Sequence, residues 1–149
     1  MHLCTPAAAV EDGAATAHAH GSIYRSRNCI EGGEVLMLVK RFSEAKPYAA
    51  SNHRACSTLR LFGAEAGGSK GLIVGVSHFL PGGGAGPDAS PPEKVYYVLA
   101  GELTVIVDGK EHVLRKDDSC YIGPNETREI VNRSNEVATI VVAVAAQPK

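Results

Sequence analysis

The chain has 149 residues, a length that suits one domain with a single buried core. Its 15 Lys and Arg residues nearly balance its 16 Asp and Glu residues, so no strong field attracts nucleic acid or anionic lipid. Apolar residues make up 44% of the chain, but they come in short runs, and none is long enough to cross a bilayer. These properties argue against nucleic-acid and membrane partners.

Residues 1–22 are rich in Ala, Thr and His without apolar periodicity, and they predict a flexible N-terminal arm before a domain that spans residues 23–149. The segment has no basic opening, and Glu11 and Asp12 interrupt its apolar run, so we expect no secretory signal there. The four cysteines are widely spaced and include no C-x-x-C pair, as is typical of free thiols in a reducing compartment. A cytoplasmic location is therefore predicted.

From Glu34 onward, short runs rich in Val, Ile, Leu, Tyr and Thr predict β-strands, beginning with EVLMLVKRF and ending with EVATIVVAVAA. Asp108-Gly109, between TVIV and KEHV, is a strong hairpin signal because both central residues of such a turn adopt positive φ. Turns are also expected at PGGG (81–84) and GPN (123–125). Many short strands in one small domain predict an all-β sandwich or closed barrel, because closure removes exposed sheet edges.

Two stretches resemble the signature motifs of the cupin superfamily: PGGGAGPDASPPEKVYYVLAGELTVIVDG, and DDSCYIGPNETREIVN further along the chain. Gly82, Gly101 and Asn132 match conserved positions of these motifs. Asn125 stands where the second motif has a glycine, and asparagine is acceptable there because it adopts left-handed backbone angles more readily than other residues with a side chain. The resemblance implies a single-domain cupin-like β-barrel, also called a double-stranded β-helix or jelly roll. It also implies pairing into a homodimer.

In the cupin family these motifs supply four metal ligands, and here all four positions carry other residues. By the motif spacing, two histidines fall on Asp88 and Ser90, the glutamate falls on Lys94, and the last histidine falls on Arg128. Ammonium and guanidinium groups repel a cation and offer no lone pair, so we expect no metal and no other cofactor at this site. The family frame turns Lys94 rather than Glu93 toward the interior, although the run VYYVL is apolar on both faces.

Two cations and one carboxylate between low-dielectric walls predict a pocket that binds a small anionic organic metabolite. Arg128, with Ser90, would bind the substrate, because the guanidinium fork matches a carboxylate. Lys94 would act as a general base or a nucleophile, because burial and a second cation lower the pKa of its amine. Asp88 would carry the proton, and Tyr96, on the same face as Lys94, would donate to a developing oxyanion.

His53 and His78 lie on predicted strands and are further candidates for substrate binding. The first hypothesis is a metal-independent enzyme that isomerises, dehydrates or decarboxylates a small carbonyl or carboxylate compound by proton transfer. The second is a cupin that binds or senses a small anion without turnover. In a third, His53, His78 and Glu93 hold a metal in a rearranged site. Against all three stands a purely structural ion pair between Asp88 and Lys94 that fills the vacated metal site.

Overall fold

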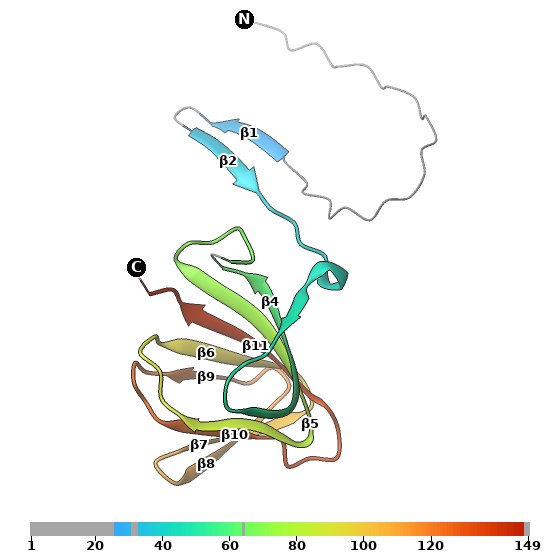
Figure 1. The fold of residues 1–149 in the computed structure, drawn as a ribbon, viewed down its shortest axis with the longest axis vertical. Helices are drawn as coiled ribbons and strands as arrows, with labels where there is room; N and C mark the ends of the chain where they lie inside the picture. The colour runs from blue at the N-terminus through green and yellow to red at the C-terminus, as the bar shows by residue number, and fades with distance from the viewer. Residues whose placement is uncertain (1–25, 31–32, 64, 148–149) are drawn as a thin grey trace, which may run out of the picture.

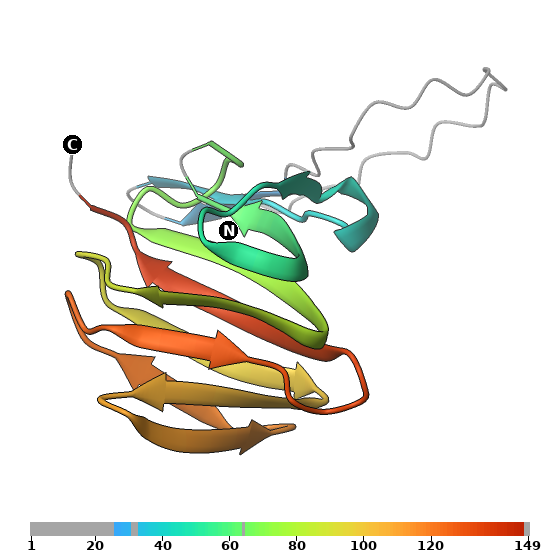
Figure 2. The ribbon, with the colours of Figure 1, turned by 60° about the horizontal axis from the view of Figure 1, so that its bottom comes forward.

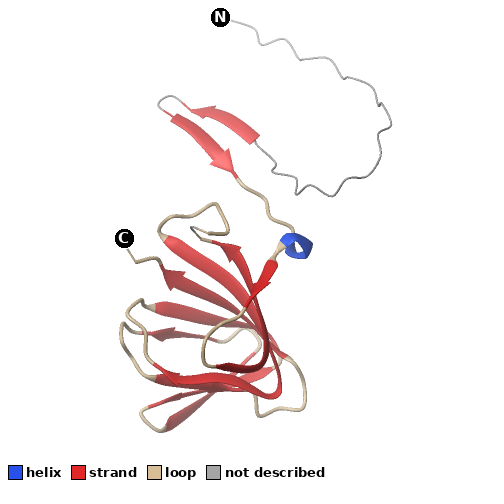
Figure 3. Ribbon diagram, in the orientation of Figure 1, coloured by secondary structure: helices blue, strands red, loops and turns tan. Residues whose placement is uncertain are grey.

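A computed structural model describes residues 26–30, 33–63 and 65–147 of the chain. These residues are almost entirely β-structure, with eleven strands and one short 3-10 helix, η1 (Phe42–Glu44) (Figure 3). The predicted all-β class is therefore confirmed, while the arm predicted for residues 1–22 lies outside the described residues. Within the described part, no helix is long and apolar enough to span a membrane.

Nine strands form one continuous sheet that curls into a nearly closed barrel (Figures 1 and 2). Along this sheet the order is β8-β7-β10-β5-β11-β6-β9, and β4 joins β3 to β5. Two further strands, β1 (Ser26–Ile30) and β2 (Gly33–Met37), pair with each other and lie beside the barrel rather than in its wall (Figure 1). The barrel strands are β3 (Lys46–Tyr48), β4 (His53–Phe62), β5 (Leu72–Asp88), β6 (Lys94–Ala100), β7 (Glu102–Val107), β8 (Lys110–Arg115), β9 (Ser119–Ile122), β10 (Arg128–Val131) and β11 (Ala138–Ala145).

Strand β5 is the longest strand and contributes to both walls of the barrel, since its first part pairs with β11 and its last part pairs with β10. The turn predicted at residues 81–84 is wrong, because the strand continues through this segment and bends there. Glycine permits the bend: φ at Gly82 is +76°, and a Cβ at Gly84 would lie 2.2 Å from the carbonyl oxygen of Ile130.

The hairpin predicted at Asp108-Gly109 is confirmed, because β7 and β8 pair on either side of it and φ is +48° and +73° at its two central residues. The expected tolerance of asparagine also holds, with a φ of +59° at Asn125. Gly101 has a φ of +75°, and a Cβ there would lie 2.6 Å from the carbonyl oxygen of Val137. The glycine that keeps the motif frame is therefore required by the backbone.

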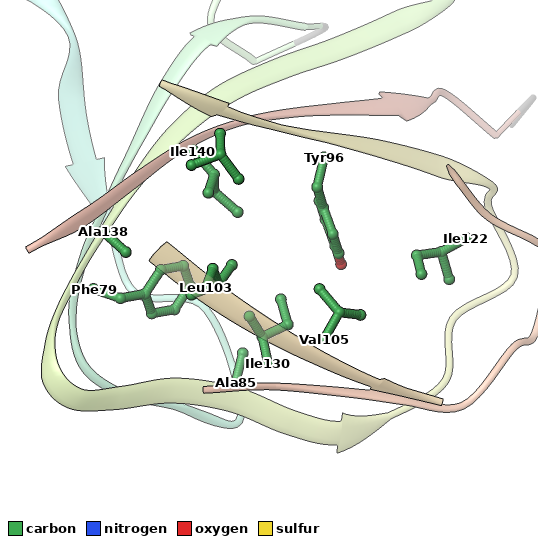
Figure 4. Close-up of a cluster of buried hydrophobic side chains, with 10 residues drawn as sticks. Phe79, Ala85, Tyr96, Leu103, Val105, Ile122, Ile130, Ala138 and Ile140 are labelled. Carbon is green, nitrogen blue, oxygen red and sulfur yellow. The ribbon is translucent and has the colours of Figure 1, made fainter. Parts of the chain in front are cut away.

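The interior of the barrel is filled with apolar side chains that come from strands on both walls (Figure 4). Close packing of this kind supplies most of the stability of a small domain. The buried cluster consists of Phe79, Ala85, Tyr96, Val98, Leu103, Val105, Ile122, Ile130, Ala138 and Ile140.

At one end of the barrel, the side chain of Asn132 is completely buried, with 0% exposure. Its Nδ2 donates to the carbonyl oxygens of Phe79 at 2.9 Å and Glu136 at 2.7 Å. Its Oδ1 accepts from the backbone N–H and the hydroxyl of Ser134. All the hydrogen-bonding capacity of this amide is used, so the motif asparagine has a structural role. We call this region the Asn132 end.

Candidate functional site

The positions that correspond to the metal ligands of cupins meet at the opposite end of the barrel, which we call the barrel mouth. Asp88 is the last residue of β5, and it lies directly opposite Arg128, the first residue of β10. Lys94 begins β6, and Ser90 lies in the loop that joins β5 to β6. A backbone hydrogen bond of 2.9 Å from Asn125 to Ser90 ties this loop to the one that follows β9.

The side chain of Lys94 faces the barrel interior, as the family frame predicts. Lys94 is 7% exposed, and it alternates with the exposed Val95 along β6. Its Nζ donates to the hydroxyl oxygen of Ser90. Glu93 is exposed instead, and its carboxylate accepts a 2.8 Å hydrogen bond from the hydroxyl of Tyr121. The ammonium group of Lys94 therefore occupies the interior side of this strand.

Arg128 connects the interior to the rim of the mouth. Its side chain is 8% exposed, whereas that of Asp88 is 47% exposed. Nη1 of Arg128 donates to the Asp88 carboxylate at 3.1 Å and also to the Asp88 backbone oxygen. On the other side, Nε donates to the hydroxyl oxygen of Tyr96 at 3.1 Å. The phenolic proton of Tyr96 remains available because its oxygen acts as the acceptor in this contact.

The charges at the mouth set the protonation states of these groups. Burial lowers the pKa of the Lys94 amine, and the nearby Arg128 lowers it further, while Asp88 opposes the change. Burial raises the pKa of the Tyr96 phenol above its ordinary value, so the phenol is neutral at neutral pH. Burial opposes the charge of Arg128, but its contacts with Tyr96 and Asp88 outweigh burial and raise its pKa. The mouth thus combines the Lys94 amine with its lowered pKa, the neutral phenol of Tyr96 and the permanently charged guanidinium of Arg128.

Lys94 and Arg128 line two different surface grooves. The groove at Lys94 has a volume of about 370 Å³ and includes Tyr121, while the groove at Arg128 has a volume of about 220 Å³ and includes Thr127. The Tyr96 side chain projects into the interior of the barrel (Figure 4). A ligand that touches both cations has to lie across the mouth or separate Arg128 from its partners.

The structure separates the two strand histidines from the mouth. His78 lies on the outer face of the barrel, where its Nδ1 contacts the Thr139 hydroxyl at 3.0 Å. His53 faces inward but stacks on Phe79, with 6.3 Å between the ring centroids, and its Nδ1 lies 2.6 Å from the Ser51 carbonyl oxygen. Phe79 belongs to the Asn132 end, so neither histidine lies beside Lys94 or Arg128.

The residues present do not fit the divalent metal that the fold family implies. At the mouth, Lys94 and Arg128 occupy two of the four ligand positions. A guanidinium cannot coordinate a cation, and the amine of Lys94 offers no lone pair while it is protonated. The alternative set of His53, His78 and Glu93 does not converge, because these side chains contact Phe79, Thr139 and Tyr121 respectively. Across residues 26–30, 33–63 and 65–147, no three His, Cys, Asp or Glu side chains gather as ion ligands do.

Two neighbours of the site were not singled out by sequence reasoning. Cys120 lies directly opposite Tyr96 in the pairing of β9 with β6, and burial raises the pKa of its thiol. Glu126 lies in the loop before Arg128, where its carboxylate accepts a 2.8 Å hydrogen bond from the Gly123 N–H. The alternation of SCYI could have placed Cys120 on the inner face, but only the folded loop places Glu126 near the mouth. Cys56 and Cys120 are free thiols, as predicted.

Comparisons with known proteins agree with this architecture. The Cupin_2 family, described as a cupin domain, matches residues 75–144. A protein of Mycobacterium tuberculosis named beta-D-galactosidase Rv1717 is 45% identical over 109 residues, which make up 73% of this chain and 94% of that protein. The chain belongs to the cupin superfamily.

Solved structures of low sequence identity share the fold. The polyketide cyclase RemF from Streptomyces resistomycificus has a TM-score of 0.67 at 15% identity, covering 75% of this chain and 81% of its own. A predicted oxalate decarboxylase from Thermotoga maritima has a TM-score of 0.63 at 24% identity, covering 74% of this chain and 100% of its own. A sugar phosphate isomerase from Silicibacter pomeroyi has a TM-score of 0.56 at 24% identity, covering 63% of this chain and 61% of its own.

Proposed function

We propose that the barrel mouth is the active site of an enzyme that transfers a proton on a small polar organic substrate without a metal ion. The observation that carries this proposal is the environment of Lys94, a buried amine whose pKa is lowered by burial and by Arg128. Enzymes tune lysine in this way when it has to act as a base near neutral pH. The adjacent neutral phenol of Tyr96 supplies a complementary proton donor.

In this mechanism the neutral amine of Lys94 removes a proton from a carbon atom next to a carbonyl or carboxylate group. The electron pair of the broken C–H bond moves toward the carbonyl oxygen, where the Tyr96 hydroxyl donates a hydrogen bond to the developing negative charge. Arg128 adds a fixed positive charge on the same side and holds a carboxylate of the substrate. Protonated Lys94 then returns the proton to another carbon of the substrate. In an elimination it instead gives the proton to the leaving group, while the enolate electron pair forms the double bond and the bond to that group breaks.

The half-exposed carboxylate of Asp88 connects this chemistry to solvent. Asp88 contacts Arg128 on its inner side and lies at the rim, so it can exchange a proton with water while it orients the guanidinium. Ser90 accepts a hydrogen bond from Lys94 and thereby fixes the direction of the amine. The names of the solved structures that share the fold include a cyclase, an isomerase and a decarboxylase, which supports use of this barrel for catalysis.

A second candidate function is hydrolysis of small β-galactosides, favoured by the relative that bears the name beta-D-galactosidase. Glycoside hydrolysis ordinarily requires two carboxyl groups on either side of the scissile bond. Asp88 at the rim and Glu126 in the neighbouring loop are two carboxylates at this end of the barrel that could fill these roles. In this case Lys94 and Arg128 would bind sugar hydroxyls rather than transfer a proton.

The test is a thermal-shift screen of small carboxylates, keto acids and sugars, followed by a chromatographic assay for consumption of each stabilising compound. Hydrolysis of 4-nitrophenyl β-D-galactopyranoside is measured in parallel. Lys94→Met is expected to abolish proton transfer, whereas Lys116→Met, at an exposed lysine, leaves turnover unchanged. Full turnover in Lys94→Met would refute the first proposal. Loss of galactoside hydrolysis in Glu126→Gln but not in Lys94→Met would favour the second.

A further inference from the structure

A third groove lies at the edge of the sheet formed by β3 and β4. It has a volume of about 340 Å³, within the size range of small-molecule sites. Residues from the short helix η1 and from the loop after β4 complete it, and the β1–β2 hairpin extends from this part of the fold (Figure 1). Three of its lining residues carry positive charge: Lys40, Lys46 and Arg60.

Two of these cations lie directly opposite each other in the sheet. Lys46 of β3 pairs with Arg60 of β4, so their side chains leave the sheet on the same face. Like charges at such a position repel each other and destabilise the pair unless an anion lies between them. Within the described residues, none of the three cations forms an ion pair with a carboxylate. The fold therefore brings three positive charges together at this edge, where two carboxylates also line the groove.

The guanidinium of Arg60 is held in place by an aromatic ring. It stacks on Tyr48 at 4.4 Å from the ring centroid, and Tyr48 lies two residues after Lys46 on the same face of β3. The Nε of Arg60 is buried, and it has no hydrogen-bond acceptor among the described residues. A buried charged donor without an acceptor is costly, and such groups in native proteins often mark the place of a missing partner.

The side chain of Lys40 is also held in position by two contacts. Its Nζ donates to the carbonyl oxygen of Ala66 at 2.5 Å and lies over the ring of Phe62, 5.5 Å from the centroid. Of the two carboxylates in the groove, Glu44 accepts a hydrogen bond from the Arg41 backbone N–H. The other carboxylate, Glu65, is exposed to solvent. The three cations of the groove thus outnumber its two carboxylates, and two of the cations, Lys40 and Arg60, are held in place by their contacts.

We propose that this groove is a second ligand site, which binds the phosphate group of a small phosphate monoester between Lys40, Lys46 and Arg60. A dianionic phosphate has enough acceptor oxygens to contact three cations, and it removes the repulsion between the paired Lys46 and Arg60. The ring of Tyr48 and the adjacent Pro47 offer an apolar surface for the organic part of the ligand. Binding at this groove does not depend on the reaction proposed for the mouth.

The register of the sheet separates the two sites. Arg60 pairs with Gly75, Gly75 pairs with Val142, and Val142 pairs with Tyr96. Three steps between neighbouring strands correspond to about 14 Å. A small ligand held by the three groove cations is therefore distinct from a ligand that contacts Tyr96 at the mouth.

The test is a titration of the full chain with phenyl phosphate and with inorganic phosphate, followed by amide chemical shifts of ¹⁵N-labelled protein. We expect saturable shifts at Lys46, Tyr48 and Arg60, with phenyl phosphate binding more tightly than inorganic phosphate. Arg60→Gln and Lys46→Gln are each expected to weaken binding by about tenfold or more, because each removes a charged contact. Lys116→Gln, at an exposed lysine elsewhere, is the matched control and leaves binding unchanged.

Thermal unfolding of each variant shows whether it folds, and Lys46→Gln keeps the test decisive if Arg60→Gln is unstable, because Lys46 is exposed. Saturable shifts confined to the mouth would overturn the proposal. Equal affinity in Lys46→Gln and the parent chain would also overturn it, as would shifts that do not saturate. Turnover at the mouth is measured separately, so failure of one proposal leaves the other open to its own test.

Discussion

The two ends of the barrel solve the burial of polar groups in opposite ways. At the Asn132 end, one neutral amide is completely buried, and backbone and hydroxyl groups satisfy all of its donors and acceptors. At the mouth, two cations are almost as deeply buried, but only Arg128 has a carboxylate partner, and that partner is half exposed. The hydrogen-bonded amide stabilises the fold, whereas the burial of the cations at the mouth lowers the free energy of unfolding.

This difference indicates what each end contributes. A neutral, fully hydrogen-bonded side chain has no means of exchanging a proton and is difficult to replace without loss of stability. A buried ammonium next to another cation costs stability, and proteins retain such groups mainly at functional sites or in structural ion networks. Variants at the two ends should therefore separate stability from activity, and that separation distinguishes an active site from a purely structural ion pair.

The largest effect on stability is expected at the Asn132 end. Asn132→Ala leaves buried carbonyl oxygens and the Ser134 N–H without their partners, so the free energy of unfolding should fall by about 2–4 kcal/mol. Denaturant unfolding measures this loss, with Asn135→Ala at an exposed neighbouring position as the control. Turnover per folded molecule should be retained, and a stability loss no larger than in the control would contradict this role.

A smaller loss is expected for Arg128→Met, about 1–3 kcal/mol. The change removes the contacts with Asp88 and Tyr96, but the exposure of Asp88 limits the cost because solvent stabilises the carboxylate that is left behind. The matched control is Arg115→Met, which removes the exposed contact with Glu102 and should change stability little. If both variants lose the same free energy of unfolding, the ion pair of Arg128 with Asp88 contributes no more than an exposed surface ion pair.

Lys94→Met is expected to leave stability unchanged or to raise it by up to about 1 kcal/mol, because an apolar side chain replaces an ammonium with a lowered pKa. Together with the expected loss of proton transfer, this result would show that Lys94 is kept for function. A loss of stability as large as that of Arg128→Met would instead favour a purely structural role for Lys94, whose amine donates to Ser90 rather than to Asp88. Melting temperatures of the two variants, measured side by side, decide between these readings.

The smallest expected effect is a change with pH in the stability difference between Lys94→Met and the parent chain. Because the pKa of Lys94 is lower in the folded chain than in the unfolded chain, the unfolded chain binds more protons between these two values. Stability therefore rises with pH through that window, which ends near the ordinary lysine pKa of about 10.4. The difference in free energy of unfolding between Lys94→Met and the parent should shrink as the pH enters the window. A difference independent of pH would contradict the lowered pKa.

Much of this organisation could be predicted from the sequence, and the exceptions have physical reasons. The inward direction of Lys94 follows from its fixed spacing to Gly101, whose backbone only glycine satisfies. The direction of His78 could not be predicted, because GLIVGVSHFL is apolar on both faces and carries no period-two signal. The position of His53 depends on an irregularity in the pairing of β4 with β5, next to Ala55 at a φ of +43°.

Contacts between distant segments were also beyond sequence reasoning. The bond between Arg128 and Asp88 joins residues 40 positions apart and depends on the register of β5 with β10. The same is true of the pairing of Lys46 with Arg60, since the strand β3 is too short to give a sequence signal. The homodimer implied by the cupin resemblance stays a prediction for measurements in solution.

Lys94 and Arg128 stand at two positions that hold metal ligands in other cupins. The most direct test of metal-independent catalysis is therefore the metal content of purified, untagged protein together with its activity after chelation. Elemental analysis should find far less than one transition-metal ion per chain, and turnover of the substrate found in the screen should survive dialysis against EDTA. One bound ion per chain, with activity that is lost on chelation and restored by that metal, would contradict the account.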